Sequence, residues 1–333
     1  MNIGPIDMVY CWCDGNDPAF QERKNYYLQQ EKGTHDSDSV GNHRFADNEE
    51  LRYSLRSLTM YAPWIHHVYI VTDRQTPRWL NTDYERVSII DHSEIMPQEL
   101  IPCFSSSIIE RYIVNIPGLS EHFLYGNDDM FFGRTIGPEF FFTSAGEPVV
   151  YVKYFEKFKR IEDLADFENK YNSASTWMKT NLRAWHLLYK NYGKHEFYVS
   201  AHNIDAYRKS LFQEALKKYN EALSEIMHYR FRNENDIERC LFNMDAVYNG
   251  HGTLKLVETP SFWKKHIHKP KGYSWVCYCG SEDEKTRKQI CRFEPYLFCI
   301  NADSKGQLED KQAMRAFYEQ LFSTASPFER EGL

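Results

Sequence analysis

The amino-acid sequence predicts an α/β fold, with a mainly parallel sheet in its first half and helices in its second half. Three observations support this prediction. Segments rich in β-forming residues alternate with segments of helical periodicity, and four of the β-rich segments run into aspartate. The composition is that of a globular protein, with 42% hydrophobic and 26% charged residues. The 333 residues suffice for one large domain or two smaller ones.

The β-rich segments of the first half are expected to be strands. They cover residues 6–12, 67–73, 87–91 and 121–125. Helices are expected between them, over residues 19–31, 47–61 and 105–116. In such Rossmann-like sheets ligands bind outside the carboxyl ends of the parallel strands, so the aspartates that follow these strands should meet at one edge. They are Asp14, Asp73, Asp91, Asp128 and Asp129.

The helix that starts near Asp47 carries several further signals. Asp47 is expected to cap it, with Glu50 three residues on as in a capping box. Its leucines recur at helical spacing and are expected to face the core: Leu51, Leu55 and Leu58. Arg52 and Arg56 lie one turn apart on another face of the helix. There they are expected either to form ion pairs with the aspartates at the strand ends or to bind phosphate.

Asp128 and Asp129 stand between two apolar segments, in the sequence LYGNDDMFF. An ionised carboxylate among apolar groups is costly unless something pairs with it. In one interpretation the two aspartates hold Mg²⁺ or Mn²⁺ against a diphosphate, because these ions prefer oxygen ligands. In the other, one aspartate caps a turn and the second pairs with a surface lysine.

The sequence pattern changes near residue 150, from alternating β-rich and helical segments to mainly helical segments. We expect one part over residues 1–150 and a second, mainly helical part over residues 151–333. Within the second part, Asn233–Asp236 are expected to cap a helix that carries Ile237 and Met244, and a last helix is expected from about residue 305. The sequence contains no internal repeat.

Two further residues are candidates for chemistry. Histidine ordinarily has a near-neutral pKa, so His202 is expected to serve as a base for a hydroxyl nucleophile, although a single histidine among 13 is also compatible with a packing role. Arg232 could clamp phosphate, because its planar guanidinium matches phosphate oxygens. The alternative for Arg232 is a salt bridge with Glu234 or Asp236.

The first strand is expected to end in a turn, WCDGNDP, that could hold a nucleotide. Trp12 could stack on a base, and Gly15 would allow close approach of the backbone. The alternative is a tight turn beside a tryptophan of the core.

Composition excludes several classes of protein. The net charge is −7 and no basic block of the nucleic-acid-binding type is present, so we expect no nucleic-acid partner. No run of 18 apolar residues and no export signal are found, which makes the cytoplasm the expected location. Of the eight cysteines, the last four lack the paired C-x-x-C spacing of zinc knuckles, so we expect free thiols.

Several motifs together resemble those of the Stealth family. IDMVY followed by Trp12 and DGNDP resembles its first region. The stretch RFADNEELRYSLRS, followed by APW, IVTD, FSS and YGNDD, resembles its second. AHNID, which contains His202, and RNEND, which begins at Arg232, resemble its third and fourth. The likeness spans about residues 5–250. Cys13 stands where valine is usual in the family, and Arg74 where glycine often follows.

The resemblance implies transfer of a hexose-1-phosphate from a nucleotide sugar, such as UDP-N-acetylglucosamine, to a hydroxyl of a glycan acceptor in capsule or exopolysaccharide synthesis. It implies a nucleotide-sugar-transferase-like core in residues 1–150, with residues 151–333 supplying the catalytic histidine and arginine. The implied cofactor is Mg²⁺ or Mn²⁺ on Asp128 and Asp129. The implied catalytic residues are His202, Arg232, Asp128 and Asp129. The resemblance implies that Trp12 and Asp14 belong to a nucleotide-sugar-binding turn. We also expect six further residues to bind substrate: Tyr10, Gly15, Asp17, Arg52, Arg56 and Asn127.

The resemblance also implies a peripheral association with a capsule assembly complex at the inner membrane face. Two other functions remain open on the sequence. A metal-dependent glycosyltransferase would use the same kinds of residue but would release a nucleoside diphosphate. A glycan-binding scaffold would keep the fold and bind sugar through its aromatic side chains without turnover.

Overall fold

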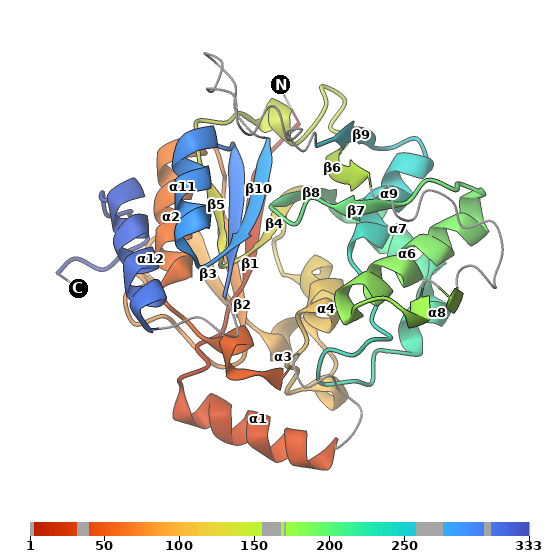
Figure 1. Cartoon of the computed structure of the whole chain (residues 1–333), viewed down its shortest axis with the longest axis horizontal. Helices are drawn as coiled ribbons and strands as arrows, with labels where there is room; N and C mark the ends of the chain where they lie inside the picture. The colour runs from red at the N-terminus through yellow and green to blue at the C-terminus, as the bar shows by residue number, and fades with distance from the viewer. Residues whose placement is uncertain are drawn as a thin grey trace.

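The fold is described from a computed structural model, shown in Figure 1. The structure describes residues 3–31, 40–154, 168–169, 171–257, 276–302 and 308–332. Most of the basic segment that follows residue 153 lies outside the described residues. Of the described part, no helix is both long enough and apolar enough to cross a membrane.

A five-stranded sheet forms the centre of the molecule. Its strands are β1 (Ile6–Cys11), β2 (Val68–Thr72), β3 (Val87–Asp91), β4 (His122–Asn127) and β8 (Asp205–Arg208). They lie in the order β3-β2-β1-β4-β8, and the first four are parallel. Strand β8 pairs antiparallel with β4. The sheet confirms the α/β prediction, and its four parallel strands match the four predicted segments.

Helices cover both faces of this sheet, because side chains alternate along each strand. Met8 and Tyr10 of β1 face a core shared with the leucines of α2 (Glu50–Tyr61). Val9 faces the opposite core, shared with Phe212 of α7 (Lys209–Lys218) and Phe242 of α9 (Cys240–Tyr248). In Figure 1, α2, α11 and α12 lie on one side of the central strands, and α6, α7 and α9 on the other. The predicted inward direction of Leu51, Leu55 and Leu58 is confirmed.

Two smaller sheets connect the halves of the chain. Strand β5 (Met130–Phe132) pairs antiparallel with β11 (Leu297–Asn301), which pairs parallel with β10 (Cys277–Ser281). Strand β6 (Val149–Tyr154) pairs with β7 (Tyr198–Ser200) and β9 (Thr253–Leu256). The sequence analysis did not predict the strands of the second half. The division near residue 150 stays a prediction, and β8 and β11 bring the two parts into common sheets.

The remaining helices complete the layers. They are α1 (Pro18–Gln30), α3 (His92–Ile95), α4 (Ser106–Ile109), α6 (Thr176–Tyr192), α8 (Asn220–Ser224), α11 (Glu284–Phe293) and α12 (Leu308–Leu321). Short 3-10 helices cover Asn42–Phe45, Gln98–Leu100, Glu110–Asn115 and Pro138–Phe140. The helix expected over residues 105–116 is therefore α4 followed by a 3-10 helix.

Two predicted helix starts are wrong in detail. Helix α2 begins at Glu50, and its N-cap is Glu49 in the left-handed region at φ 64°. Asp47 instead accepts a hydrogen bond from the Glu49 N–H, while Glu50 accepts one from the Asn48 N–H. The two carboxylates thus accept hydrogen bonds from backbone N–H groups of the turn that leads into the helix. Helix α9 begins only at Cys240, because the stretch after Arg232 forms a turn.

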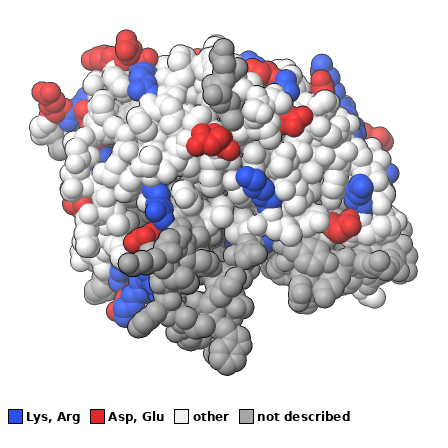
Figure 2. Space-filling model, turned by 90° about the horizontal axis from the view of Figure 1, so that it is seen from above, with Lys and Arg blue, Asp and Glu red and all other residues white. Residues whose placement is uncertain are grey.

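The charges on the surface do not form a large patch of one sign in the view of Figure 2. There, over the part of that face that the structure describes, lysine and arginine side chains lie scattered among aspartate and glutamate and are separated by uncharged surface. This distribution fits the modest net charge of −7.

Candidate active site

A cavity of about 230 Å³ opens at the carboxyl ends of the parallel strands. The ends of β1, β2, β4 and β11 contribute to its wall, together with the segment before α2. In Figure 1, α1 lies at the end of the molecule where β1 finishes. The strand-end Asp73 lines the cavity, together with six of the predicted catalytic and substrate-binding residues: Trp12, Asn127, Asp128, Asp129, His202 and Arg232.

Asp128 and Asp129 form the turn between β4 and β5. Both flanking strands are buried, so the turn must present its carboxylates at the sheet edge. Burial raises the pKa of both groups, and the charge of Asp129 raises the pKa of Asp128 further. The pKa of Asp129 rises to about 6. Its Oδ1 atom is buried and accepts no hydrogen bond from the described part of the chain.

Two more carboxyl groups, those of Glu50 and Asp47, lie close to the Asp pair. Glu50 lines the cavity, and burial followed by the charge of Asp47 raises its pKa to about 8. Burial raises the pKa of Asp47 to about 6, although Asp47 accepts a hydrogen bond from Trp12 Nε1 at 3.4 Å. Both charges act on Asp128. The sequence analysis assigned these two residues to a helix cap and missed their place beside the Asp pair.

These carboxylates fit a hard divalent cation. Oxygen atoms are the ligands that Mg²⁺ and Mn²⁺ prefer, and the buried Oδ1 of Asp129 is available for a ligand bond. Buried groups of like charge cannot all ionise without a compensating cation. Asp128 and Asp129 would hold the ion, which would supply positive charge opposite a diphosphate.

His202 enters the cavity from the loop between β7 and β8. Its backbone lies in the left-handed region at φ 54°, which is uncommon for a histidine, and its N–H donates to Ser200 Oγ at 3.1 Å. Nε2 lies 3.3 Å from Asn301 Oδ1. Burial, followed by the charge of Arg239, lowers the pKa of His202 to about 3. The near-neutral pKa expected from the sequence is therefore wrong for the unliganded cavity, because burial disfavours the imidazolium. The imidazole is neutral near pH 7 and has a lone pair to accept a proton.

Arg232 lies on another part of the cavity wall. Its Nη2 donates to Ser106 Oγ, at the start of α4, at 2.7 Å. The contact holds the guanidinium at the cavity, where its planar, charged fork suits an anionic ligand.

One wall of the cavity is aromatic and was missed by the sequence analysis. Phe20, Phe45 and Phe104 line it beside Trp12. They come from α1, from the 3-10 helix before α2 and from the segment before α4. Because these segments are far apart in the sequence, no local periodicity predicts that they meet.

The turn after β1 lies beside the cavity. Its polar residues form hydrogen bonds with other residues of the chain. The Gly15 N–H donates to the Phe45 carbonyl at 2.6 Å, and a Cβ at Gly15 would collide with that oxygen. Asp17 caps α1, and a hydrogen bond from Gln75 lowers the pKa of Asp17. The Asp14 carboxylate accepts from the Asn16 N–H. These residues shape the turn without lining the cavity.

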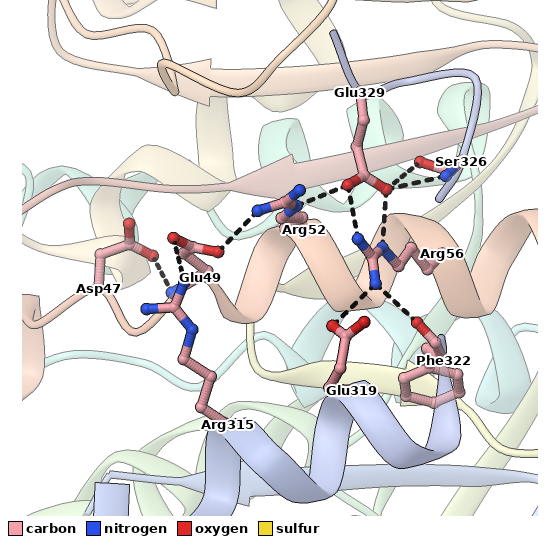
Figure 3. A network of polar contacts seen from close by, with 9 residues as sticks. All are labelled: Asp47, Glu49, Arg52, Arg56, Arg315, Glu319, Phe322, Ser326 and Glu329. Carbon is pink, nitrogen blue, oxygen red and sulfur yellow. Dashed lines mark hydrogen bonds and ion pairs between the residues drawn. The ribbon is translucent and has the colours of Figure 1, made fainter. Parts of the chain in front are cut away.

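Three other predicted binding residues also lie outside the lining. Tyr10 is fully buried and accepts a hydrogen bond from Ser54 of α2. Arg52 and Arg56 contact Glu329 at 2.6 and 2.8 Å, as Figure 3 shows. They face the carboxyl-terminal segment because that segment packs against their side of α2. The structure thus places them neither at acidic strand ends nor at the cavity.

The two departures from the family pattern lie in or near the cavity. Cys13 lines it. Arg74 follows Asp73, which also lines it, and adopts the left-handed region at φ 57°. That conformation favours glycine, which is the residue common in the family at this position.

Comparison with known proteins identifies the family. The model of Stealth protein conserved region 1 matches residues 4–32, and that of conserved region 2 matches residues 44–150. The chain is 32% identical to capsular polysaccharide phosphotransferase fcs1 of Haemophilus influenzae, over 96% of this chain and 82% of that protein. It is 35% identical to exopolysaccharide phosphotransferase cps2G of Lactiplantibacillus plantarum, over 69% of this chain and 72% of that protein.

Other relatives are longer than this chain. Exopolysaccharide phosphotransferase SCO6023 of Streptomyces coelicolor is 34% identical over 98% of this chain, which spans only 53% of its length. Among solved structures, one of the galactosyltransferase LgtC covers 98% of both chains at 8% identity and a TM-score of 0.43, which is too distant to assign a function. The two conserved regions and the relatives that match over most of their length show that this chain belongs to the Stealth family.

Proposed function

We propose that the protein transfers a hexose-1-phosphate from a UDP-linked sugar to a hydroxyl group of a glycan acceptor, forming a phosphodiester. One observation carries the proposal. A single cavity collects Asp128, Asp129, His202 and Arg232 from three separate segments of the chain. The names of the relatives, which are capsular and exopolysaccharide phosphotransferases, support the reaction class.

The donor would bind with its diphosphate between the Asp pair and Arg232. A divalent cation on Asp128 and Asp129 would neutralise charge on that diphosphate when bound. The aromatic wall, formed by Phe20, Phe45 and Phe104 beside Trp12, offers an apolar surface for the nucleoside. Glu50 lies next to the Asp pair, and because burial raises its pKa to about 8, a bound cation would be needed to favour its ionised form near pH 7.

The chain's own side chains would then carry the transfer. Neutral His202 accepts the proton of the acceptor hydroxyl, and that oxygen attacks the phosphorus that bears the sugar. The bond from this phosphorus to the oxygen of the nucleoside monophosphate breaks, and the electron pair leaves with the nucleotide. Arg232 stabilises charge on the equatorial oxygens. The anomeric C–O bond stays intact, so the configuration of the donor sugar is kept.

Asn301 would position the base. Its Oδ1 lies 3.3 Å from His202 Nε2 and can accept a hydrogen bond from that nitrogen when it is protonated. Binding of an anionic donor would also offset the positive charges that lower the pKa of His202, which come chiefly from Arg239 and then Arg232.

Product analysis tests the proposal. The chain is incubated with candidate UDP-sugars, Mg²⁺ or Mn²⁺ and a short capsule-type acceptor, and the nucleotides and the acceptor are examined by chromatography and ³¹P NMR. We expect UMP and a phosphodiester signal in the acceptor. UDP together with an acceptor that contains no phosphorus would establish a glycosyltransferase instead. Donor binding without release of any nucleotide would favour a glycan-binding scaffold.

A further inference from the structure

A cluster of two thiols and an imidazole lies beside the proposed base. Strands β10 and β11 are parallel with Cys279 opposite Cys299, so both side chains leave the same face of that small sheet. The loop before β8 brings His202 to them. The ligand atoms of the three residues all lie within 4.8 Å of one another.

Asn301 holds this cluster together. Its Nδ2 donates to Cys279 Sγ at 3.1 Å, and its Oδ1 accepts from Cys299 Sγ at 3.7 Å. The same Oδ1 faces His202 Nε2 at 3.3 Å. One side chain thus orients all three potential ligands, as partners in the outer shell do at metal sites.

The donor set differs in kind from the Asp pair. Sulfur and imidazole nitrogen favour zinc and similar thiophilic cations, whereas carboxylate oxygens favour magnesium. Two sulfurs bound tetrahedrally at Zn–S distances of about 2.3 Å stand about 3.8 Å apart, so the observed spacing requires only small side-chain adjustments. His202 and Asn301 also line the cavity, which leaves the outer coordination position accessible to solvent or substrate.

The sequence spacing of the cysteines does not indicate such a site. The ligands come from two neighbouring strands and from a loop far upstream, so no C-x-x-C pair is formed. All eight cysteines are free thiols in the structure.

We propose that Cys279, Cys299 and His202 form a binding site for a thiophilic divalent cation such as Zn²⁺, and that its occupancy switches the transferase off. Binding releases the thiol protons to solvent and occupies a nitrogen lone pair of the imidazole. His202 can then no longer accept the acceptor proton. The inhibitory part rests on the proposed function, whereas the binding site does not.

Cobalt binding tests the site without any activity assay. The metal-free full chain, kept reduced with a phosphine, is titrated with Co²⁺ in the presence of saturating Mg²⁺. We expect one Co²⁺ per chain, with a thiolate-to-cobalt charge-transfer band and the visible band of a tetrahedral centre, both abolished by Zn²⁺. Cys279→Ser should weaken binding at least 100-fold. Cys291→Ser, at an exposed cysteine on α11, is the matched control and should leave the bands unchanged.

Two further variants guard against a folding artefact. Cys299 is fully buried, so Cys299→Ser is interpreted only if its circular dichroism and melting temperature match the wild type; the half-buried Cys279 carries the main test. His202→Ala should keep the charge-transfer band but weaken binding. Absence of the band in the wild type, or an unchanged band in Cys279→Ser, would overturn the site.

The inhibitory part has its own measurement. In the transfer assay with Mg²⁺, stoichiometric Zn²⁺ should suppress at least nine-tenths of the activity of the wild type and of Cys291→Ser, and a chelator should restore it. Cys279→Ser should resist the same Zn²⁺ concentration. Cobalt binding without inhibition by Zn²⁺ would overturn the switch. A chain that binds cobalt but makes no phosphodiester product would overturn the proposed function and leave the metal site standing.

Discussion

The protein contains two sets of carboxylates with opposite surroundings: four at the cavity, and Glu329 with Glu319 at the carboxyl-terminal segment. At the cavity, Asp128 and Asp129 lie with Glu50 and Asp47, and the pKa of each is raised by burial. At the carboxyl-terminal segment, burial acts in the same direction on Glu329, but hydrogen bonds from Arg56, the Ser326 N–H and Arg52 lower its pKa to about 2. Figure 3 shows Glu329 with Arg52, Arg56 and Ser326.

The difference separates a site from a structural contact. Glu329 is satisfied by the protein itself, through two guanidinium groups on α2 and the Ser326 N–H. Asp129 retains a buried oxygen without a partner in the described part of the chain. A carboxylate whose charge the fold leaves uncompensated is suited to a ligand, whereas a compensated one stabilises the fold. Mutations in the two sets should therefore have different consequences.

The largest effect is expected at the cavity. His202→Ala removes the proposed base and should reduce the transfer rate about 10³-fold or more, because general-base catalysis contributes on this scale. Donor affinity, measured by calorimetry, should stay within about threefold of the wild type, since the diphosphate contacts lie elsewhere. Normal turnover in this variant would show that another group accepts the proton.

Glu329→Gln should give the largest loss of stability. It leaves Arg52 and Arg56 without their shared buried carboxylate, which should lower the free energy of unfolding by about 3 kcal/mol. Urea denaturation measures this. Glu319→Gln is the matched control: Glu319 contacts the same Arg56 but is half exposed, so its loss should cost less than about 1 kcal/mol. Equal losses in the two variants would contradict a special role for Glu329.

Asp129→Asn should reduce activity without reducing stability, in contrast to Glu329→Gln. The substitution removes one of several mutually repelling buried charges, so the melting temperature without metal should not fall. The transfer rate should drop about 10²-fold, because charge stabilisation in the transition state is lost. The Mg²⁺ concentration for half-maximal activity should rise. An unchanged metal titration would remove Asp129 from the cation site.

A smaller effect is expected from pH at the second set. The pKa of Glu329 falls from its usual 4.5 to about 2 on folding, so its stabilising contribution is complete above pH 4.5 and is lost as the pH falls through about 2. The difference in unfolding free energy between the wild type and Glu329→Gln should thus be smaller at pH 3 than at pH 7. A difference independent of pH would mean that packing, not charge, accounts for the loss.

The sequence was most informative where local pattern decides the structure. Alternation of β-rich and helical segments, with aspartates at the strand ends, predicted the parallel strands, so the edge that carries Asp128 could be located before the fold was known. It was least informative where distant segments meet. The opposition of Cys279 and Cys299 depends on the register of two short strands, and the contact of Arg52 with Glu329 joins residues 277 apart in the chain. No local periodicity encodes either contact.

The position of bond cleavage tests the central claim most directly. The donor is prepared with ¹⁸O in the oxygen that joins the sugar C1 to phosphorus, and the masses of the products are measured by mass spectrometry. Transfer of a hexose-1-phosphate predicts that the label stays with the sugar in the new phosphodiester and that the released nucleoside monophosphate is unlabelled. Label in a released nucleoside diphosphate would show that the anomeric bond is broken, and would contradict the proposed roles of His202 and Arg232.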